Sequence, residues 1–480
     1  GLWRQSWNNG ALTRLEPVRE VMTFAEKPWF RDVTGHVFGD EPSFHQQLAR
    51  GVPYWRSRLD PACGIDLYGE NGIAVADIDS DGRDEIYVCQ PGGLPNRLYK
   101  NDGNGHFRDI SESAGLDILD DTASALFADF RNSGHQDLVL VRTNRPILFL
   151  NDGQGRFKPV PDAFRFASAP QGSFTSVAAA DFDRDGRLDL YLCCYVYFQS
   201  EAQYRYPVPY HDAQNGPPNF LFRNRLDRNP GYFEDVTSST GMDHNNNRFS
   251  FAAAWCDYNG DGWPDLYVTN DFGRKNLYRN TNGRFRDVAE QAGVVDLGPG
   301  MSAAWLDYDG DGRPDLLVSN MWSASGQRIV NDPAFGPVAQ DPSLRDAYRQ
   351  HVKGNSLYHN NGDGTFTYTG DSQGIEIVPW SWSCDGCDFD NDGSPEIYVA
   401  CGMLTNNGAD DLMSYFYRQV VAKSPVKHGA APAYENGWNA INQLVRQDYS
   451  WAGREPNVLF ARRAGRYYDF SGASGIDCAE

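Results

Sequence analysis

The chain has 480 residues, of which 64 are acidic and 43 basic, so its formal net charge is −21 at pH 7. This excess of acid excludes nucleic acid and anionic membranes as expected partners, because neutralising phosphates requires a surplus of Lys and Arg. No apolar run approaches the roughly 18 residues of a membrane span. An aromatic content of 13% with 48 Gly suits an all-β protein with many turns.

Residues 1–60 form an N-terminal segment without the repeats that follow it. The first residues, Gly1-Leu2-Trp3, carry no signal sequence, so we expect any such segment to have been removed. Near the end of the segment, residues 29–34 (Trp-Phe-Arg-Asp-Val-Thr) predict a strand.

From residue 77 onward a nine-residue loop recurs, with carboxylates at positions 1, 3, 5 and 9, Gly at position 6 and an apolar strand on each side. Alternate residues of a tight turn point their oxygens inward, Gly permits a positive φ, and position 7 can offer a backbone carbonyl. The first half matches the EF-hand calcium loop, but the closing acid and the flanking strands differ from it. One copy could be an Asp-Gly turn that binds nothing. Five copies in phase predict metal sites.

The predicted metal-binding residues are, loop by loop, Asp77, Asp79, Asp81, Arg83 and Glu85; Asp181, Asp183, Asp185, Arg187 and Asp189; Asp257, Asn259, Asp261, Trp263 and Asp265; Asp307, Asp309, Asp311, Arg313 and Asp315; and Asp388, Asp390, Asp392, Ser394 and Glu396. Loops of this type bind calcium weakly, at about 10⁻⁴–10⁻³ M, which cytosolic calcium never reaches. We therefore expect about five calcium ions per chain and a secreted, cell-surface or periplasmic protein. These ions would offset about half of the negative charge.

A sixth copy of the loop begins at Asp129 but has Arg131 and Ser133 where carboxylates should be. It keeps only Gly134 and Asp137 of the remaining pattern. We interpret it as a loop that has lost its metal, with the Arg131 guanidinium in the place of the cation.

Each loop is followed by a hairpin, such as Asn276-Leu277-Tyr278-Arg279-Asn280 before Gly283-Arg284-Phe285. Asn-Gly and Asp-Gly turns between alternating apolar residues are a strong hairpin signal. One repeat therefore holds four antiparallel strands, which at a period of about 40–50 residues predicts a propeller blade. The predicted propeller covers residues 61–480, with repeats at 72–110, 124–160, 175–237, 250–288, 301–369 and 381–470.

These residues resemble the FG-GAP/VCBS repeat family of integrin α heads, and most of all the subgroup of bacterial ASPIC/UnbV proteins and cartilage acidic protein. The tract from Asn270 to Asn280 (NDFGRKNLYRN) looks like that subgroup, whereas the C-terminal ASPIC/UnbV module is absent. The resemblance implies seven blades. We expect an incomplete seventh blade whose outermost strand is residues 29–34; a six-bladed ring closed by that strand is the alternative.

Nine cysteines leave at least one unpaired. A Cys63–Cys478 disulfide that locks the ring is one possibility. Cys384 and Cys387 have C-x-x-C spacing, with Cys401 on the following strand, which allows a redox pair or a soft-metal site. Cys256 and Cys387 share one repeat position, immediately before the first loop aspartate, which favours thiols buried between blades over a functional site.

Three long insertions follow the second strands of repeats three, five and six, at about 195–218, 320–353 and 402–455. Metal loops join strands one and two, so insertions between strands two and three must lie on the opposite face. We expect short helices near 341–351, 411–421 and 438–445, and their apolar stripes fit packing against the propeller better than a cofactor site. The Tyr- and Pro-rich first insertion is either a binding surface or a lid. The candidate ligand residues on this face are Tyr206, Tyr210, His211, Arg248, Asp271, Arg274, Trp322, Lys353 and Trp382.

Nothing in these residues fixes a reaction, although His211, Asp212 and His351 could meet over the channel. The leading hypothesis is a calcium-stabilised binding or adhesion module for a protein, glycan or small molecule. The alternatives are an enzyme with its site on the insertion face, and a subunit of an assembly in which a partner chain completes the seventh blade. A deep polar pocket would favour the enzyme, and an aromatic surface would favour the binder.

Overall fold

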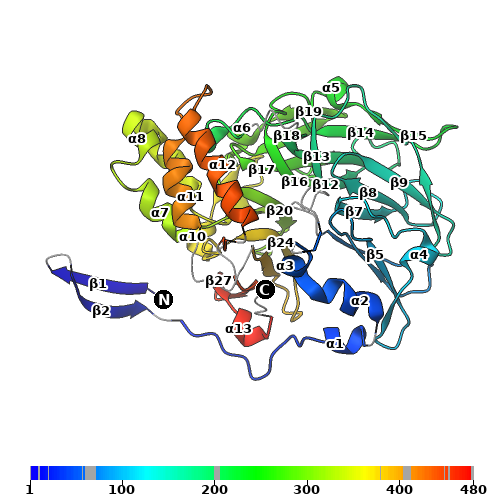
Figure 1. Cartoon of the computed structure of the whole chain (residues 1–480), viewed down its shortest axis with the longest axis horizontal. Helices are drawn as coiled ribbons and strands as arrows, with labels where there is room; N and C mark the ends of the chain where they lie inside the picture. Colours follow the sequence, from blue (N-terminus) through cyan, green and yellow to red (C-terminus); the bar gives the residue numbers. More distant parts are fainter. Residues whose placement is uncertain are drawn as a thin grey trace.

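The computed structural model describes residues 2–8, 11–19, 21–39, 41–56, 58–59, 72–198, 206–378, 380–403, 412–447, 449–451 and 455–476. Within them, six antiparallel sheets of four strands are arranged as blades (Figure 1). The first strands of consecutive blades lie side by side from β3 through β7, β12, β16 and β20 to β24. The predicted propeller of four-stranded blades is confirmed.

The strands of each blade follow one another from the inside of the ring outward. Blades 1 and 2 contain β3 (Ile73–Ala76), β4 (Glu85–Val88), β5 (Arg97–Asn101) and β6 (Phe107–Asp109), then β7 (Thr122–Ala128), β8 (Asp137–Arg142), β9 (Pro146–Asn151) and β10 (Phe157–Val160). Blades 3 and 4 contain β12 (Gly172–Ala180), β13 (Asp189–Tyr197), β14 (Phe220–Arg225) and β15 (Tyr232–Asp235), then β16 (Phe249–Cys256), β17 (Asp265–Phe272), β18 (Asn276–Thr281) and β19 (Arg284–Asp287). Blades 5 and 6 contain β20 (Gly300–Leu306), β21 (Asp315–Asn320), β22 (Ser356–Asn360) and β23 (Phe366–Tyr368), then β24 (Ser381–Cys387), β25 (Glu396–Cys401), β26 (Val458–Arg463) and β27 (Arg466–Asp469). A short strand, β11 (Phe164–Arg165), adds to the outer edge of blade 3 in parallel.

Local sequence explains the hairpin between the third and fourth strands. Between β18 and β19, Asn282 and Gly283 have φ values of 53° and 75°, as a two-residue hairpin turn of right-twisted strands requires. After the fourth strand, Asp287 Oδ1 accepts a hydrogen bond from Ala289 N at 3.1 Å and starts a four-residue helix. A short helix ends five blades: α4 (Ser111–Ala114), α5 (Thr237–Thr240), α6 (Ala289–Ala292), α10 (Gly370–Gln373) and α13 (Ser471–Ser474). All but α10 begin with the same aspartate bond.

In blades 2 to 5, an asparagine at the end of the third strand joins the blade to the one before it. Asn280 is fully buried, and its Nδ2 donates to the carbonyl of Phe182 in the preceding blade's loop at 2.9 Å. Asn151, Asn224 and Asn360 make the equivalent bonds at 2.8–2.9 Å. In blade 1, Asn101 Oδ1 accepts from Gly103 N within its own turn.

Blades 1 and 6 each present a face that lacks a neighbouring blade within the described part of the chain. Ile73 and Val75 on β3 are 65% and 57% exposed, although the equivalent Ala253 and Trp255 of blade 4 pack against blade 3. On blade 6, Phe389 is 40% exposed, whereas the equivalent Tyr258 is buried. These faces fit an incomplete ring, and the seventh blade stays a prediction.

The predicted strand at residues 29–34 is wrong. Residues 29–33 are irregular, and α1 (Thr34–Val37) begins at the last of the six. Asp32 Oδ1 does accept from Thr34 N at 2.8 Å, as at the end of a blade. A strand also needs a ladder partner, however, and the described residues supply one bond to blade 6, from Phe30 N to Ser474 O at 2.9 Å.

The rest of the N-terminal segment comprises a separate hairpin and short helices. The hairpin of β1 (Leu2–Asn8) and β2 (Ala11–Arg19) lies apart from the ring in Figure 1. The helices α2 (Pro42–Gln46), η1 (Leu48–Arg50) and α3 (Gly51–Arg56) follow α1. α2 covers the open side of blade 1, where Ser43 Oγ lies 3.2 Å from Tyr99 OH.

The insertions fold together into a helical layer at one side of the ring (Figure 1). It contains η3 (Tyr210–Asp212), α7 (Ala324–Val330), α8 (Gly336–Gln340), η4 (Pro342–Leu344), α9 (Arg345–Gln350), α11 (Met413–Gln419), η5 (Val421–Lys423) and α12 (Pro432–Arg446). Helices predicted near 341–351, 411–421 and 438–445 are confirmed, and α12 is longer than expected. No helix in the described ranges is long and apolar enough to cross a membrane.

Candidate functional sites: acidic loops and an aromatic cavity

The first aspartate of each acidic loop shapes the turn by itself. In blade 1, Asp77 Oδ1 accepts from Asp81 N at 3.0 Å and its Oδ2 accepts from Gly82 N at 2.8 Å. Asp181, Asp257, Asp307 and Asp388 make the same two bonds at 2.7–3.0 Å. The position-1 aspartate therefore holds the turn through hydrogen bonds to the loop's own backbone.

The acid at position 9 lies beneath the loop and is fully buried in all five cases. Asp189, for example, accepts from Phe182 N at 3.2 Å and from Asn224 N at 2.7 Å. Burial raises the pKa of Asp189 to about 8, that of Asp265 to about 7 and that of Asp315 to about 6, because a charged carboxylate loses its hydration there.

Four of the five loops gather carboxylates that could hold a metal ion. The groups are Asp77, Asp79 and Glu85; Asp181, Asp183 and Asp189; Asp307, Asp309 and Asp311; and Asp388, Asp390 and Glu396. Within the described residues, buried carboxylate oxygens of these loops are left without a hydrogen-bond donor: Asp79 Oδ1, Asp183 Oδ1, Asp309 Oδ1 and Glu396 Oε1. An unpaired buried carboxylate oxygen is what a hard cation satisfies, so these residues fit such an ion.

In the remaining loop, Asn259 supplies position 3. Its Oδ1 accepts from Asp261 N at 2.9 Å, and its Nδ2 lies 3.4 Å from Asp265 Oδ2. The amide oxygen is thus held within the turn beside Asp257.

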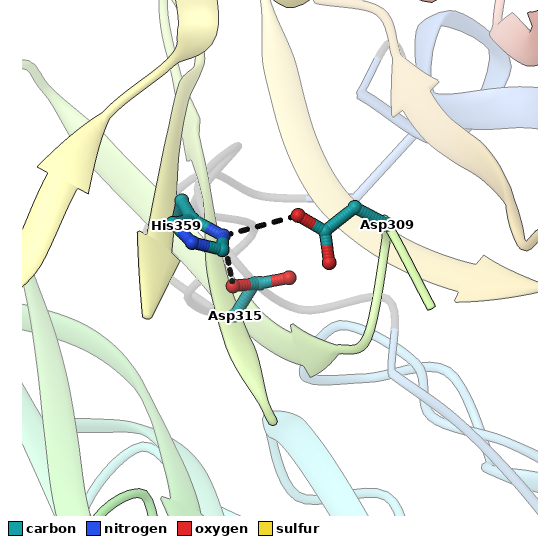
Figure 2. A group of neighbouring side chains, drawn as sticks. All are labelled: Asp309, Asp315 and His359. Carbon is teal, nitrogen blue, oxygen red and sulfur yellow. Dashed lines mark ion pairs between the residues drawn. The ribbon is translucent and has the colours of Figure 1, made fainter. Parts of the chain in front are cut away.

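A basic side chain from each blade's outer hairpin faces the loop carboxylates. In blade 5, His359 Nδ1 lies 3.1 Å from Asp309 Oδ2 and 3.4 Å from Asp315 Oδ1, as Figure 2 shows. Lys100 Nζ lies 2.6 Å from Asp79 Oδ2 in blade 1. Arg223, Arg279 and Arg463 face the loops of blades 3, 4 and 6 in the same way. These side chains lie where they can balance the carboxylate charge that remains after a divalent ion has bound.

The residue at position 7 makes hydrogen bonds that close each loop, and in blade 1 it also bonds to the third strand. The backbone N–H of Arg83, Arg187, Trp263, Arg313 and Ser394 donates to the position-5 carboxylate at 2.9–3.2 Å. The side chain of Arg83 also reaches the carbonyl of Asn101 at 3.0 Å. The Trp263 ring lies 5.2 Å from the guanidinium of Arg184.

The loop at Asp129 holds an arginine where the others gather carboxylates. Arg131 Nε and Nη2 donate to the two oxygens of Asp137 at 2.9 and 2.7 Å, and Asp137 is fully buried. Asp129 still accepts from Ser133 N and Gly134 N at 2.8 and 2.7 Å. The guanidinium therefore pairs with the position-9 acid, as the interpretation requires, and that a cation occupies this place in the other loops stays a prediction.

On the opposite face, the insertions and three inner strands enclose a cavity of about 110 Å³. Aromatic rings form its wall as a closed chain of contacts, with neighbouring centroids 5.1–6.2 Å apart; the rings in turn are Tyr195, Phe251, Trp382, Trp380, Trp451, Phe416, Trp438, Phe272, Phe249 and again Tyr195. All of them line the cavity.

A single carboxylate belongs to this wall. Asp271 is 8% exposed, and its Oδ2 accepts a hydrogen bond from Tyr195 OH at 2.6 Å. It is the only Asp, Glu, His, Lys or Arg among the described residues that line the cavity. Burial raises the pKa of Asp271 to about 7, although the Tyr195 hydroxyl and the charge of Lys275 lower it.

The structure brings five of the predicted ligand residues together here, namely Tyr206, Tyr210, Asp271, Trp322 and Trp382. The other four lie elsewhere. Arg248 forms an ion pair with Asp212, and Arg274 Nε lies 3.4 Å from the same carboxylate. Lys353 Nζ lies 2.9 Å from Glu376.

His211 and His351 are packed inside the helical layer. His351 is 1% exposed, and its Nε2 lies 3.0 Å from the carbonyl of His211. Burial lowers the pKa of His351 to about 3, so its ring is neutral. The predicted meeting of His211, Asp212 and His351 over the channel is wrong, because Asp212 pairs with Arg248 and none of the three lines the cavity.

Several wall residues escaped the sequence prediction, above all Phe249, Phe251 and Met301 at the beginnings of inner strands. The residue six positions before the first aspartate of each loop could have identified Phe251 and Met301. This position holds Ala123 in blade 2 and Thr175 in blade 3 but Phe251, Met301 and Trp382 in blades 4 to 6. Large apolar side chains there point into the channel.

The cysteines do not form the site that their spacing allowed. Cys384 is buried and Cys387 exposed on one strand, and both are free thiols. Burial raises the pKa of Cys384 to about 12, which disfavours its thiolate. Cys63 and Cys478 lie outside the described residues, so their pairing stays a prediction.

Fold and loops together define a β-propeller of FG-GAP-like repeats. A family model described as "FG-GAP-like repeat" matches residues 77–140, 129–192, 257–318 and 346–399, which contain the acidic loops and the arginine loop. The resemblance noted in the sequence is confirmed.

Curated relatives of the matched part are the cartilage acidic protein 1 sequences. The protein from Xenopus tropicalis is 30% identical over 230 residues, which are 46% of this chain and 32% of that protein. The mouse protein (Mus musculus) is 28% identical over 229 residues, again 46% of this chain and 32% of the relative. The match thus spans about a third of the length of these relatives.

Solved structures resemble the chain more distantly. An Agrocybe aegerita lectin described as recognising non-reducing terminal N-acetylglucosamine aligns with a TM-score of 0.41 and 14% identity, over 85% of this chain and 84% of the lectin. An ancestral GH74 enzyme aligns with a TM-score of 0.36 and 11% identity, over 84% of this chain and 47% of the enzyme.

Proposed function

We propose that the chain is a secreted binding module, in which calcium stabilises the propeller on one face and a ligand binds in the aromatic cavity on the other. The observation that carries this proposal is the closed aromatic wall around a cavity with one buried carboxylate. Concave, mostly apolar sites with few polar groups are typical of small-molecule binding.

Calcium is the ion that the acidic loops fit best. Their ligands are carboxylate, amide and backbone oxygens, the hard donors that calcium prefers over the softer transition metals. The residues that would hold it are those at positions 1, 3, 5 and 9, with the position-7 carbonyl. A bound ion would screen the repulsion among acids such as Asp77, Asp79 and Asp81. Weak loops of this type are filled only outside the cytosol, which supports secretion.

Binding is better supported than catalysis because of what the cavity lacks among its described residues. General acid–base chemistry needs a proton donor and an acceptor of matched pKa within reach of the substrate. Asp271 has no second carboxylate, His or Lys beside it in the wall. The aromatic lining is the feature that favours a binder.

A screen of small solutes by thermal shift, in calcium buffer, tests the binding function. Val196 lies in the cavity wall, whereas Phe198, two residues along the chain, is 42% exposed outside it. Val196→Trp should fill the cavity and abolish every stabilising hit, and Phe198→Trp should leave the hits unchanged. Hits that survive Val196→Trp, or no hits with the wild-type protein, would contradict the proposal.

A further inference from the structure

The cavity has a charge character that narrows the class of ligand. Aromatic rings present a negative face, so a wall of Trp, Tyr and Phe attracts cations. The carboxylate of Asp271 adds negative charge in the same enclosure, and its Oδ2 is held by Tyr195. The ring faces and the carboxylate both attract a cation, and this attraction is stronger in a site shielded from water.

The nearest basic side chain does not cancel this charge. Lys275 is 1% exposed, and its Nζ donates to Asp296 Oδ1 at 3.0 Å and to the carbonyl of Gly298 at 2.6 Å. Its ion pair with Asp296 therefore neutralises it outside the cavity, which Lys275 does not line. Above the raised pKa of Asp271, about 7, the field inside the cavity is that of the ionised carboxylate and the ring faces.

Size separates a small head group from a larger ligand. At about 110 Å³, the cavity is smaller than the roughly 150 Å³ engineered cavity that holds benzene. A cation with a few alkyl groups fits such a space. A hexose with its hydroxyl groups is larger than benzene and would have to remain partly outside.

We propose that the cavity binds a small organic cation, an alkylammonium head group, between the aromatic wall and the carboxylate of Asp271. This inference rests on the proposed binding function and assigns its ligand class. The cation lies against ring faces such as those of Trp382 and Phe251, with its positive charge toward Asp271.

Indole N–H groups indicate a second feature of the ligand. Trp322 and Trp380 line the cavity, and the described residues supply no acceptor for their buried Nε1 atoms. A hydroxyl or carboxylate oxygen on the ligand satisfies such a donor. A cation that also carries an oxygen, as choline does, therefore binds more tightly than tetramethylammonium.

Titration of the calcium-loaded full chain with choline at pH 8, above the raised pKa of Asp271, tests the inference by tryptophan fluorescence and calorimetry. The neutral isostere 3,3-dimethylbutan-1-ol has the same shape without the charge, and we expect it to bind at least tenfold more weakly. Equal binding of the two would overturn the cation inference and leave the binding function standing. Binding of N-acetylglucosamine in place of choline would do the same. Failure of every solute, including the hits of the screen, would contradict both.

Asp271→Asn keeps an acceptor for the Tyr195 hydroxyl and removes the charge. We expect it to weaken choline at least tenfold and to leave 3,3-dimethylbutan-1-ol unchanged, whereas Phe198→Ala outside the wall changes neither. Unchanged choline affinity in Asp271→Asn would overturn the inference. Should that variant not fold, Trp382→Leu, which removes one ring face, must weaken choline more than the isostere.

Discussion

Two neighbouring loops, at Asp129 in blade 2 and at Asp181 in blade 3, have the same backbone hydrogen bonds but differ at positions 3 and 5, which are Arg and Ser in the first and two Asp in the second. In each, the first aspartate accepts from the backbone N–H groups of positions 5 and 6 at 2.7–2.9 Å. In each, a buried acid at position 9 closes the loop. The first fills its centre with Arg131, and the second leaves Asp183 Oδ1 without a donor. The comparison teaches that position 1 shapes the loop, and we propose that positions 3 and 5 determine whether it binds an ion.

Removing calcium should have the largest effect, because it acts on all five carboxylate loops together. With sites of about 10⁻⁴–10⁻³ M in 10 mM calcium, each occupied loop contributes about 1.4–2.7 kcal/mol to the free energy of unfolding. Chelation should lower the melting temperature by roughly 10 °C or more, and calcium should restore it where magnesium does not. A melting temperature that ignores chelator would contradict the metal assignment.

Arg131→Ala should destabilise blade 2 by about 3–5 kcal/mol, because it leaves the buried carboxylate of Asp137 without its partner. Denaturant unfolding at pH 7 measures the change. Arg156→Ala, an exposed residue of the same blade, is the matched control and should stay within about 0.5 kcal/mol. Equal effects of the two substitutions would mean that the guanidinium is not needed.

Asp271 provides a contrast, since it is a buried acid that no loop accounts for. Burial raises its pKa from an ordinary 3.8 to about 7, whereas the hydrogen bond from Tyr195 and the charge of Lys275 lower it. The hydroxyls of Tyr210 and Tyr417 lie near the carboxyl. The folded state holds this proton more tightly, so stability falls as pH rises from about 4 to about 7. Asp271→Asn removes this loss and should be more stable than wild type above pH 7, by at most a few kcal/mol at about 1.36 per pKa unit. Thermal melts at pH 4 and pH 8 measure the difference in stability between the variant and the wild type. The same difference at both pH values would contradict the raised pKa of Asp271.

Asn280→Ala tests the joint between blades with a smaller effect. It removes the donor for the carbonyls of Phe182 and Pro264, both within 3.0 Å, and should cost about 1–3 kcal/mol. Asn101→Ala removes a bond within one turn of blade 1 and should cost less than about 1 kcal/mol. Urea unfolding measures the loss of stability in both variants. Equal losses would show that the Asn280 bond between blades contributes no more than a bond within one turn.

The loops and blades could be predicted because their determinants are local. Asp77 bonds to groups four and five residues away, and Asn282-Gly283 makes its turn alone. The cavity could not be assembled from sequence, because its wall joins residues as far apart as Tyr195 and Trp451. The sequence predicts Asp271 as a ligand residue, but it does not show that aromatic rings surround this carboxyl. The strand at 29–34 failed for a related reason, since a local motif cannot supply a distant ladder partner.

The most direct test of the account is the calcium content of the natively purified protein, measured by elemental mass spectrometry beside a variant that converts the arginine loop. Arg131→Asp with Ser133→Asp restores acids at positions 3 and 5 of the loop at Asp129. We expect about five calcium ions in the wild-type chain and one more in the variant. No calcium in the wild type, or the same number in both, would contradict the claim that positions 3 and 5 decide between a free ion and a built-in cation.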